Sequence, residues 1–470
     1  MSFVVYDLAL LGIFILLITI FLRRNKHRIK KEGLLLLYKA EWGIKLIHKV
    51  GNKYKKSLKI LSYVSVVLGY ILMIGMIYLA YNIIKIYLLR PDIVSQVKVP
   101  PIMPLIPYID KFVTFLPPFY FTYWIIILAV IAISHEFAHG IFAAYNKVRI
   151  KKTGFGFFPF FLPVFLAAFV ELDEKKMVKK PNFSQRAILA AGTFANIVTA
   201  IVFLIVLGIF FMLAFAPAGV SFDGYVTSVV PIASITMVNN VSVENPTIED
   251  IKDYMTNASF NYIKAEGKNY VGVKGFSGDM KLVELYNSAP AINAGLNGAI
   301  LSINEIKINS INKLSSELEK YNPGDAVKIK TKVKEEVQIK EITLAEHPSI
   351  EGKAWLGVGF SNREGGSIMN RIFAAISSFK KPNVYYESKI GEAGWFIYNL
   401  LWWLILISVS VALVNMLPMG IFDGGRFFYL TILALTGNEK LAKQSFSIVT
   451  KLFLLLLFAI MAFWAYVVIF

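Results

Sequence analysis

The amino-acid sequence predicts a polytopic α-helical membrane protein with about six transmembrane helices, a membrane re-entrant hairpin and an inserted α+β extramembrane domain. Of its 470 residues, 56% are hydrophobic and only 17% are charged. Five long runs carry no charge: 60–84, 112–134, 187–222, 393–422 and 452–470. Each run can supply the roughly 20 apolar residues that cross a hydrocarbon core about 30 Å thick.

A sixth apolar run, from Ser2 to Leu22, is interrupted only by Asp7. It is longer than a signal peptide, lacks a basic leader and precedes no small-x-small cleavage site, so we expect it to be an anchor. Twelve Lys and Arg residues follow between Arg23 and Lys56. A dense basic loop beside a span indicates the cytoplasmic side, which places the N-terminus outside. The net charge of +18 then indicates contact with the lipid bilayer and its anionic headgroups, and no nucleic-acid partner.

These runs divide the chain into successive parts. The expected spans are 3–22, 60–88, 121–146, 187–215, 395–417 and 452–470. The expected parts are a two-span anchor with a basic loop (1–119), a first membrane core (120–217), an extracytoplasmic domain (218–365), a linker or interfacial helix (366–394), a second membrane core (395–430) and a C-terminal span (431–470).

Residues 153–170 are uncharged but do not fit a helix. Gly154, Gly156, Pro159 and Pro163 interrupt the segment, and its phenylalanines favour strands. Irregular backbone at membrane depth is tolerated only when it is buried in protein or lines a wet cavity. We therefore predict a re-entrant loop or hairpin, with an interfacial loop as the alternative.

The segment 218–365 is charged and alternating, as expected of a folded domain outside the membrane. The stretch Ser288–Gly298, the following 299–304 and the turn Pro323-Gly324-Asp325 resemble a PDZ domain. In that family the first stretch is a short helix entering a strand. Residues 328–344 alternate like a pair of strands.

The linker 366–394 has its own pattern. Apolar side chains recur at helical spacing from Ile368 to Phe379. This favours an interfacial amphipathic helix, although a helix packed on the preceding domain would have the same pattern.

The third span contains the motif His135-Glu136-Phe137-Ala138-His139. An unpaired charge at membrane depth costs at least ~2.5–3.5 kcal/mol, so three ionisable side chains there require a strong partner. On a helix the two histidines share one face, as zinc ligation requires, and Glu136 can act as a base. The chain has no cysteine and only five histidines. The motif therefore predicts a divalent metal held by His, Asp or Glu.

A third ligand has to come from elsewhere in the chain. Asp423 follows the fifth span in the sequence Asn415-Met-Leu-Pro418-Met-Gly-Ile-Phe-Asp423-Gly-Gly. Pro418 should end the helix, and the two glycines allow close approach of the backbone to a metal. An Asx turn at a helix end is the alternative.

Asn196 and Asn415 are amides in apolar spans, where an unsatisfied amide is costly. If the metal and Glu136 catalyse hydrolysis, such amides are candidates for donating a hydrogen bond to the tetrahedral oxyanion of that reaction. Hydrogen bonding between helices is the alternative.

The two motifs together resemble the double signature of the site-2 protease family of intramembrane metalloproteases. Ala191–Asn196 resembles the family's Ala-Gly-Pro-x-x-Asn element, and a PDZ domain between core spans recurs in that family. The resemblance implies one zinc per chain held by His135, His139 and Asp423. It also implies that Glu136 is the general base, and that Asn196 and Asn415 lie near the scissile bond.

Several positions depart from the family pattern and put the shape of the substrate cleft in doubt. Thr193 replaces a proline, Gly420 and Ile421 stand where prolines are common, and Ala167 and Ala168 stand where two glycines are frequent.

The implied function is hydrolysis of peptide bonds within or near transmembrane helices of membrane-protein substrates. The active site would lie in the membrane nearer the cytoplasmic face. A peptide or a substrate ectodomain would meet the PDZ domain outside. Three other functions remain: an ion or proton transporter, a catalytically inactive PDZ-bearing adaptor, and an anchored zinc hydrolase working in water. Inverted repeats are not visible, and the apolar flanks of His135 oppose the last.

Overall fold

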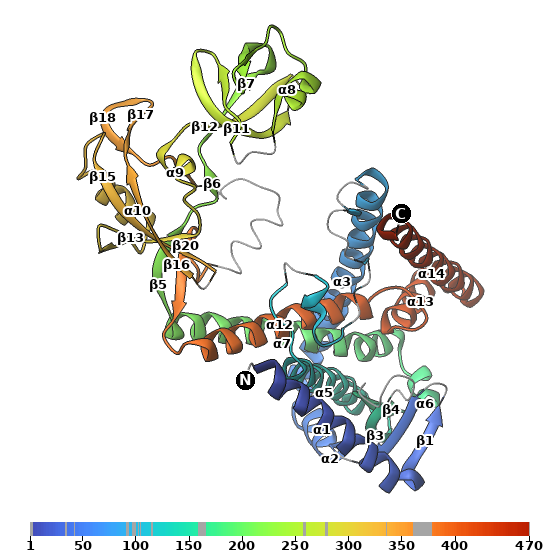
Figure 1. Ribbon diagram of the computed structural model, residues 1–470. Coiled ribbons are helices and arrows are strands. Elements are labelled where there is room, and N and C mark those ends of the chain that lie inside the picture. The colour runs from blue at the N-terminus through green and yellow to red at the C-terminus, as the bar shows by residue number, and fades with distance from the viewer. Residues whose placement is uncertain are drawn as a thin grey trace. The chain divides into compact units, whose positions relative to one another are not determined.

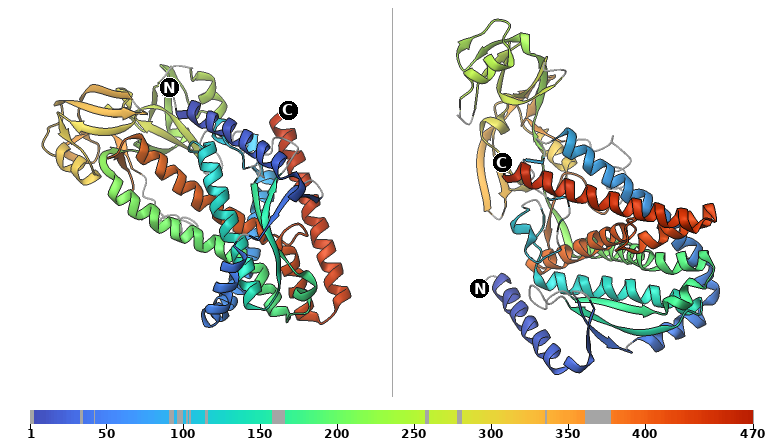
Figure 2. Two further views of the ribbon diagram at one scale, coloured as in Figure 1. Left: turned by 90° about the horizontal axis from the view of Figure 1, so that it is seen from below. Right: turned by 90° about the vertical axis from the view of Figure 1, so that its right-hand side faces the viewer.

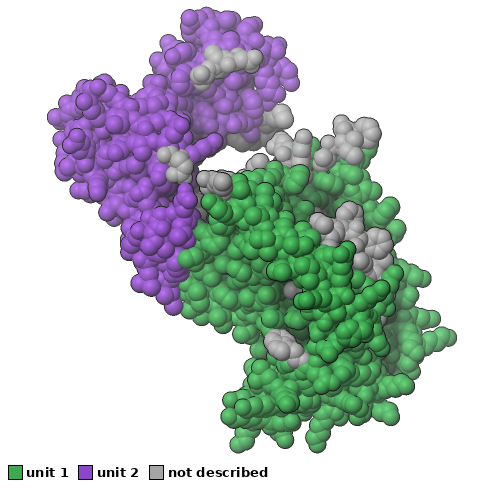
Figure 3. Space-filling model, turned by 60° about the horizontal axis from the view of Figure 1, so that its bottom comes forward, with its two compact units in different colours: residues 1–207, 396–470 green, residues 208–395 purple. Residues whose placement is uncertain are grey.

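The structure is a computed structural model that divides into two compact units. Unit 1 comprises residues 1–207 and 396–470, and unit 2 comprises 208–395 (Figure 3). The described residues are 3–32, 35–41, 43–90, 94–95, 100–101, 103, 105–113, 116–157, 166–256, 260–277, 281–334, 336–360 and 378–469.

Six helices among the described residues are long and apolar enough to cross a membrane. Helices satisfy all their own backbone hydrogen bonds, which lipid requires. The six are α1 (Phe3–Arg24), α3 (Lys55–Leu89), α5 (Phe121–Tyr145), α7 (Asn182–Ala214), α12 (Glu392–Asn415) and α14 (Glu439–Ile469) (Figure 1). Each expected span is found, which confirms a multi-pass membrane protein. The helices that were not expected include α2 (Ile44–Lys53) and α13 (Asp423–Thr436).

Asp7 joins α1 to α5. It is the one buried residue of α1, and its carboxylate accepts hydrogen bonds from Phe121 N at 2.7 Å and Thr122 N at 2.9 Å. The hydroxyls of Thr122 and Tyr108 donate to it at 2.5 and 2.6 Å. The first turn of a helix leaves its N–H groups without partners, and Tyr120, the N-cap of α5, supplies no side-chain bond. Asp7 therefore caps α5 from another helix.

A four-stranded antiparallel sheet lies in unit 1. Its order is β1 (Ile29–Glu32), β2 (Leu35–Ala40), β3 (Ile150–Phe157) and β4 (Leu166–Leu172). In the register, Lys39 faces Gly154 and Gly154 faces Phe169. A Cβ at residue 154 would collide with the carbonyl oxygen of Tyr38, so this glycine lets β2 pair closely. The basic loop after α1 is thus part of the sheet.

The strands of the predicted hairpin are present in this sheet, while its tip, 158–165, lies outside the described residues. The insertion of this hairpin into the membrane stays a prediction. Strand β4 is an edge of the sheet and runs beside α5 (Figures 1 and 2). Among the described residues, no strand therefore pairs with the other side of β4, next to the helix that carries His135 and His139.

Helix α2 packs closely against the C-terminal half of α5. Ile47 is fully buried, and a Cβ added at Gly140 would lie 2.9 Å from its side chain. A Cβ at Gly51 would lie 2.8 Å from the Cβ of Ala144. Small residues at a helix contact let two backbones approach, as is common between membrane helices.

Unit 2 contains two larger sheets, each with its own apolar core. The first has the order β7 (Thr227–Pro231), β12 (Leu282–Asn287), β11 (Lys268–Ser277), β10 (Ile263–Ala265), β8 (Ile235–Val238) and β9 (Val241–Ser242). The second has the order β16 (Glu336–Thr343), β15 (Ala326–Val333), β13 (Ala299–Ile303), β5 (Phe215–Ser221) and β20 (Val384–Ser388), with β14 (Ile306–Lys307) paired to β13.

The local predictions within 288–344 are confirmed. Helix α9 (Pro290–Asn293) precedes β13, and β15 pairs with β16 along their whole lengths. The assignment of this region to the PDZ family stays a prediction.

The predicted interfacial helix rests on the apolar repeat 368–379, of which 368–377 lie outside the described residues, so this helix stays a prediction. Further along the same linker, 384–388 forms strand β20. Val384, Tyr385 and Tyr386 favour strand, and β5 offers them an edge with which to pair.

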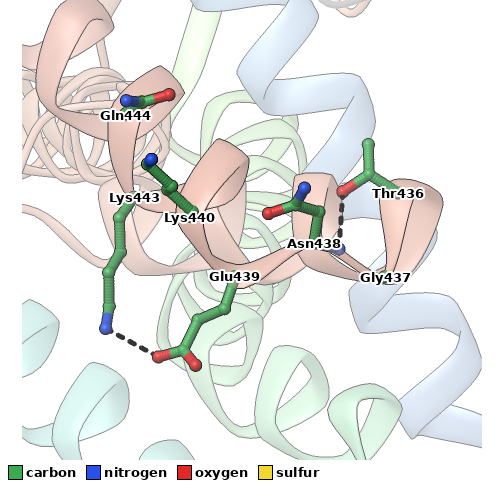
Figure 4. A pocket seen from close by; sticks show the side chains of 7 residues that line it. All are labelled: Thr436, Gly437, Asn438, Glu439, Lys440, Lys443 and Gln444. Atoms are coloured by element: carbon green, nitrogen blue, oxygen red, sulfur yellow. Dashed lines mark hydrogen bonds and ion pairs between the residues drawn. The ribbon is translucent and has the colours of Figure 1, made fainter.

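The turn between α13 and α14 is tightly built (Figure 4). Gly437 adopts the left-handed conformation with φ of 65° and ends α13. Asn438 Oδ1 accepts from Leu441 N at 3.0 Å, and Glu439 pairs with Lys443 at 2.7 Å. The turn surrounds an open surface hollow of about 700 Å³ lined by 436–440, Lys443 and Gln444.

Asp7→Ala should destabilise the protein. The substitution leaves two backbone N–H groups of α5 unpaired in a buried position, so we expect the free energy of unfolding to fall by about 2–4 kcal/mol. Thermal unfolding in detergent measures this. Leu8→Ala is the matched control, because Leu8 is 49% exposed on the same helix. Equal losses in the two variants would contradict the capping role.

Candidate metal centre

His135 and His139 lie one turn apart on the same face of α5, and both are buried. Their Nε2 atoms are 3.0 Å apart. Asp423 comes from the far side of the sequence, as the first residue of α13. Its Oδ2 lies 3.2 Å from Nε2 of His139 and 3.5 Å from Nε2 of His135.

The three donor atoms have the spacing that a zinc ion imposes on its ligands. A tetrahedral ion about 2.0–2.1 Å from each donor holds the donors roughly 3.3–3.4 Å apart. The observed separations are 3.0, 3.2 and 3.5 Å. Two imidazoles and one carboxylate also form a common donor set of catalytic zinc sites. The residues therefore fit the metal that the sequence predicts.

Helix α7 supports the two histidines through residues 188, 192 and 196, which share one face. The carbonyl of Ile188 accepts from Nδ1 of His139 at 2.7 Å, and the amide of Asn196 lies 3.0 Å from Nδ1 of His135. Between them, a Cβ at Gly192 would fall within 2.5 Å of Nε2 of His135. Gly192 thus makes room for the centre. This role was not predicted from the sequence, in which the one signal is the position of Gly192 four residues before Asn196.

These contacts determine which nitrogen of each ring faces the metal position. A carbonyl only accepts, so Nδ1 of His139 carries the proton and Nε2 offers its lone pair. Asn196 is fully buried, and its Oδ1 has no hydrogen-bond partner among the described residues. The two ends of an amide are interchangeable in shape. When Oδ1 faces the ring, it accepts from Nδ1 of His135 and frees Nε2 of that ring as well.

The surroundings of Asp423 differ from those predicted. The sequence placed Gly424 and Gly425 so that the backbone could approach a metal. In the structure, Cβ atoms there would collide with the carbonyls of Met416 and Met419. The two glycines therefore pack the first turn of α13 against the preceding turn. A carboxylate at a helix N-terminus is also favoured by the helix dipole.

Glu136 and Asn415 differ in the hydrogen bonds that their side chains make. Oε2 of Glu136 accepts from the backbone N–H of Val170 on β4 at 2.8 Å, a contact that the sequence does not predict. Asn415 ends α12 and is partly buried. Its side chain makes no hydrogen bond to any residue that the structure describes. The structure thus brings Asn196 to the histidines and provides no such link for Asn415.

Comparison with known proteins agrees with this geometry. The family model described as Peptidase family M50 matches residues 123–460, while a search of the curated proteins finds no match. The matched segment covers more than two thirds of the chain and contains His135, His139 and Asp423. The chain therefore belongs to peptidase family M50, the site-2 protease family.

Proposed function

We propose that this protein is an intramembrane zinc metalloprotease that hydrolyses peptide bonds within or near transmembrane helices of other membrane proteins. One zinc ion would be held by His135, His139 and Asp423. The observation that carries the proposal is the convergence of these three donor atoms, 3.0–3.5 Å apart, from helices nearly 290 positions apart in sequence. Membership of a peptidase family supports the same chemistry.

Zinc in such a site lowers the pKa of a bound water to about 7 and polarises a peptide carbonyl. Glu136 would take the proton from the attacking water and pass it to the leaving nitrogen. The N–H of Val170 orients the Glu136 carboxylate, and Asn196 and Ile188 orient the two imidazoles. In this proposal Asn196 supports the ligand set directly, and an oxyanion contact from Asn196 or Asn415 is secondary.

The free edge of β4 is the proposed binding site for the substrate backbone. A transmembrane helix hides its amide bonds and must unwind to be cut, and the unwound segment then needs backbone partners. Val170 sends its N–H away from β3, toward Glu136. In an antiparallel ladder such outward groups recur every second residue, so Ala168 also presents its N–H and C=O at this edge. A strand added at Ala168 would lie next to the proposed base.

The membrane orientation in this proposal follows the basic loop between α1 and α3. That loop lies in the cytoplasm, so α5 runs inward and places His135 nearer the cytoplasmic face, while unit 2 is extracytoplasmic. The rival functions, a proton relay and an inactive adaptor, give no reason for a carboxylate at ligand distance from both histidines.

Unit 2 offers a groove for an extended peptide. It lies between α10 (Ile311–Leu318) and the segment 353–360, which includes β19 (Val358–Gly359), and has a volume of about 270 Å³. Its lining includes the apolar side chains of Leu314, Leu318 and Leu356. We propose that the ectodomain of a trimmed substrate docks here through an apolar chain end, as the predicted PDZ fold implies.

Substitutions of the proposed metal ligands and of the proposed base should have different effects on zinc content and on cleavage. Wild-type protein purified in detergent should contain about one zinc per chain, and His135→Ala and Asp423→Ala should each lose most of it. Glu136→Gln should keep its zinc and lose at least roughly 100-fold in cleavage of a labelled single-span peptide in proteoliposomes.

His48→Ala is the control for these measurements, because His48 lies on α2 and is not one of the three ligands. Zinc retained by Asp423→Ala would require a different third ligand. A wild-type protein without zinc under metal-replete conditions would defeat the proposed function.

Ala168→Pro tests the strand-addition step. Proline removes the outward N–H, and an edge strand tolerates this because no neighbouring strand uses the group. We expect cleavage to fall at least about 10-fold while zinc content stays at the wild-type level. Ala168→Val keeps the N–H and should retain cleavage. If both variants cleave like wild type, the substrate does not pair at this edge.

Leu318→Asp should weaken processing of a substrate whose ectodomain ends in a free apolar residue, because it places a charge in the groove. Ile306→Asp is the control, being 44% exposed and outside the groove lining. The measurement is the rate at which each variant cleaves this substrate and a second substrate with a bulky ectodomain. Faster cleavage of the bulky substrate by Leu318→Asp would indicate exclusion in place of docking.

A further inference from the structure

Helices α3, α7 and α13 meet in a polar cluster that the proposed reaction does not use. Arg186 on α7 donates from Nη1 to the hydroxyl of Tyr70 on α3. Tyr70 Oη and Thr431 Oγ1 on α13 are 3.0 Å apart. Nearby, Asn182 Nδ2 on α7 donates to the carbonyl of Leu430 at 2.9 Å. We refer to Tyr70, Asn182, Arg186 and Thr431 as the α13 anchor.

The hydrogen bonds of the anchor have a fixed direction. The Arg186 guanidinium only donates, so the Tyr70 oxygen accepts from it and gives its own proton to Thr431. The Thr431 hydroxyl in turn donates to the carbonyl of Phe427 at 2.8 Å. This single chain of donors runs from α7 through α3 to α13.

The α13 anchor buries polar atoms whose hydrogen bonds are incomplete among the described residues, which costs stability that apolar side chains would not cost. Arg186 bonds to a neutral phenol instead of a carboxylate, and its buried Nε has no hydrogen-bond partner among the described residues. Oδ1 of Asn182 is buried and unpaired as well. A largely desolvated guanidinium that has no carboxylate partner costs stability. A gain in stability therefore does not by itself explain this cluster.

The anchor fixes the face of α13 that carries Asp423. Residues 423, 427, 430 and 431 follow the i, i+4, i+7, i+8 spacing of one helical face. Thr431 lies eight residues beyond Asp423, about 12 Å along the axis. Phe427 packs on this side too, because a Cβ at Gly69 of α3 would lie 3.2 Å from its ring.

Apolar contacts are non-directional, so they specify the rotation of a helix less sharply than hydrogen bonds do. The hydrogen bonds to Leu430 and Thr431 add such direction. They therefore bear on both the rotation and the height at which the Asp423 carboxylate meets His135 and His139.

We propose that Arg186 and Tyr70 are positioning residues for Asp423, acting through Thr431 to hold α13 in the orientation that completes the metal centre. The inference rests on the proposed function, because it assumes that Asp423 is a metal ligand. Neither Arg186 nor Tyr70 touches the donor atoms.

The test measures zinc affinity by competition with a chelator, on full-length protein in detergent. Tyr70→Phe and Thr431→Val each remove one hydroxyl from the anchor and should weaken zinc binding about 10-fold, the effect expected of a residue that orients a ligand. Thr431→Ser keeps the hydroxyl and should bind zinc like wild type. Arg186→Gln should resemble Tyr70→Phe.

Two controls match these changes on the same helices. Tyr63→Phe alters another tyrosine of α3, 57% exposed. Thr436→Val alters another threonine of α13, whose hydroxyl bonds to the carbonyl of Ile432 at 2.8 Å. Both controls should leave zinc affinity unchanged. The absorption spectrum of cobalt-substituted protein gives a second readout, and it should shift in Tyr70→Phe and Thr431→Val because the carboxylate ligand is displaced.

The outcomes separate this inference from the proposed function. If wild type binds no zinc, the proposed function fails first. If wild type binds zinc, and the anchor variants lose thermal stability while zinc affinity and the cobalt spectrum stay as in wild type, the anchor is only structural and the inference is overturned.

Discussion

Ionisable side chains inside apolar helices need partners on other helices, and this requirement organises unit 1. Asp7 is satisfied by the first turn of α5 and by Tyr108. Asp423 meets the two histidines of α5, and Arg186 meets Tyr70. Because lipid supplies no competing water, each such contact chooses one arrangement of helices from many that would bury similar apolar area. The polar residues therefore specify the assembly that the apolar residues stabilise.

The same requirement links the sheet to the proposed metal centre. Glu136 lies beside the proposed metal ligands in sequence and accepts its hydrogen bond from the backbone of an edge strand. Strands β1 and β2 come from the basic loop. Strand β1 pairs with β2 and β2 pairs with β3, which leaves β4 as the edge beside α5. An edge strand normally invites unwanted pairing. Here one of its N–H groups is already used by the proposed base, which limits where an added strand can pair.

Features that depend on local pattern were predictable from the sequence, and those that depend on distant contacts were not. Long apolar runs located the six spans because length and hydrophobicity alone define a span. The spacing of His135 and His139 predicted that they share one face, because this spacing is a property of one helix. The pairing of β2 with β3 joins segments more than a hundred residues apart, and no local sequence pattern predicts it. Gly192 and Asp7 were visible as residues, but their roles appear only when α7 and α1 are placed against α5.

The residues of the proposed metal centre lie on both sides of unit 2 in the sequence. The way in which the chain enters and leaves unit 2 explains how they can still come together. Strand β5 follows α7 directly, and β20 precedes α12 by a few residues. The two strands pair antiparallel, with Phe215 opposite Ser388. The chain therefore leaves the end of α7 and returns to the start of α12 through neighbouring strands. The entropic cost of bringing the ends of a loop together grows only slowly with the length of the loop. Here the pairing of β5 with β20 holds the two ends together. Asp423 can thus join the histidines of α5 whatever the length of the chain between β5 and β20.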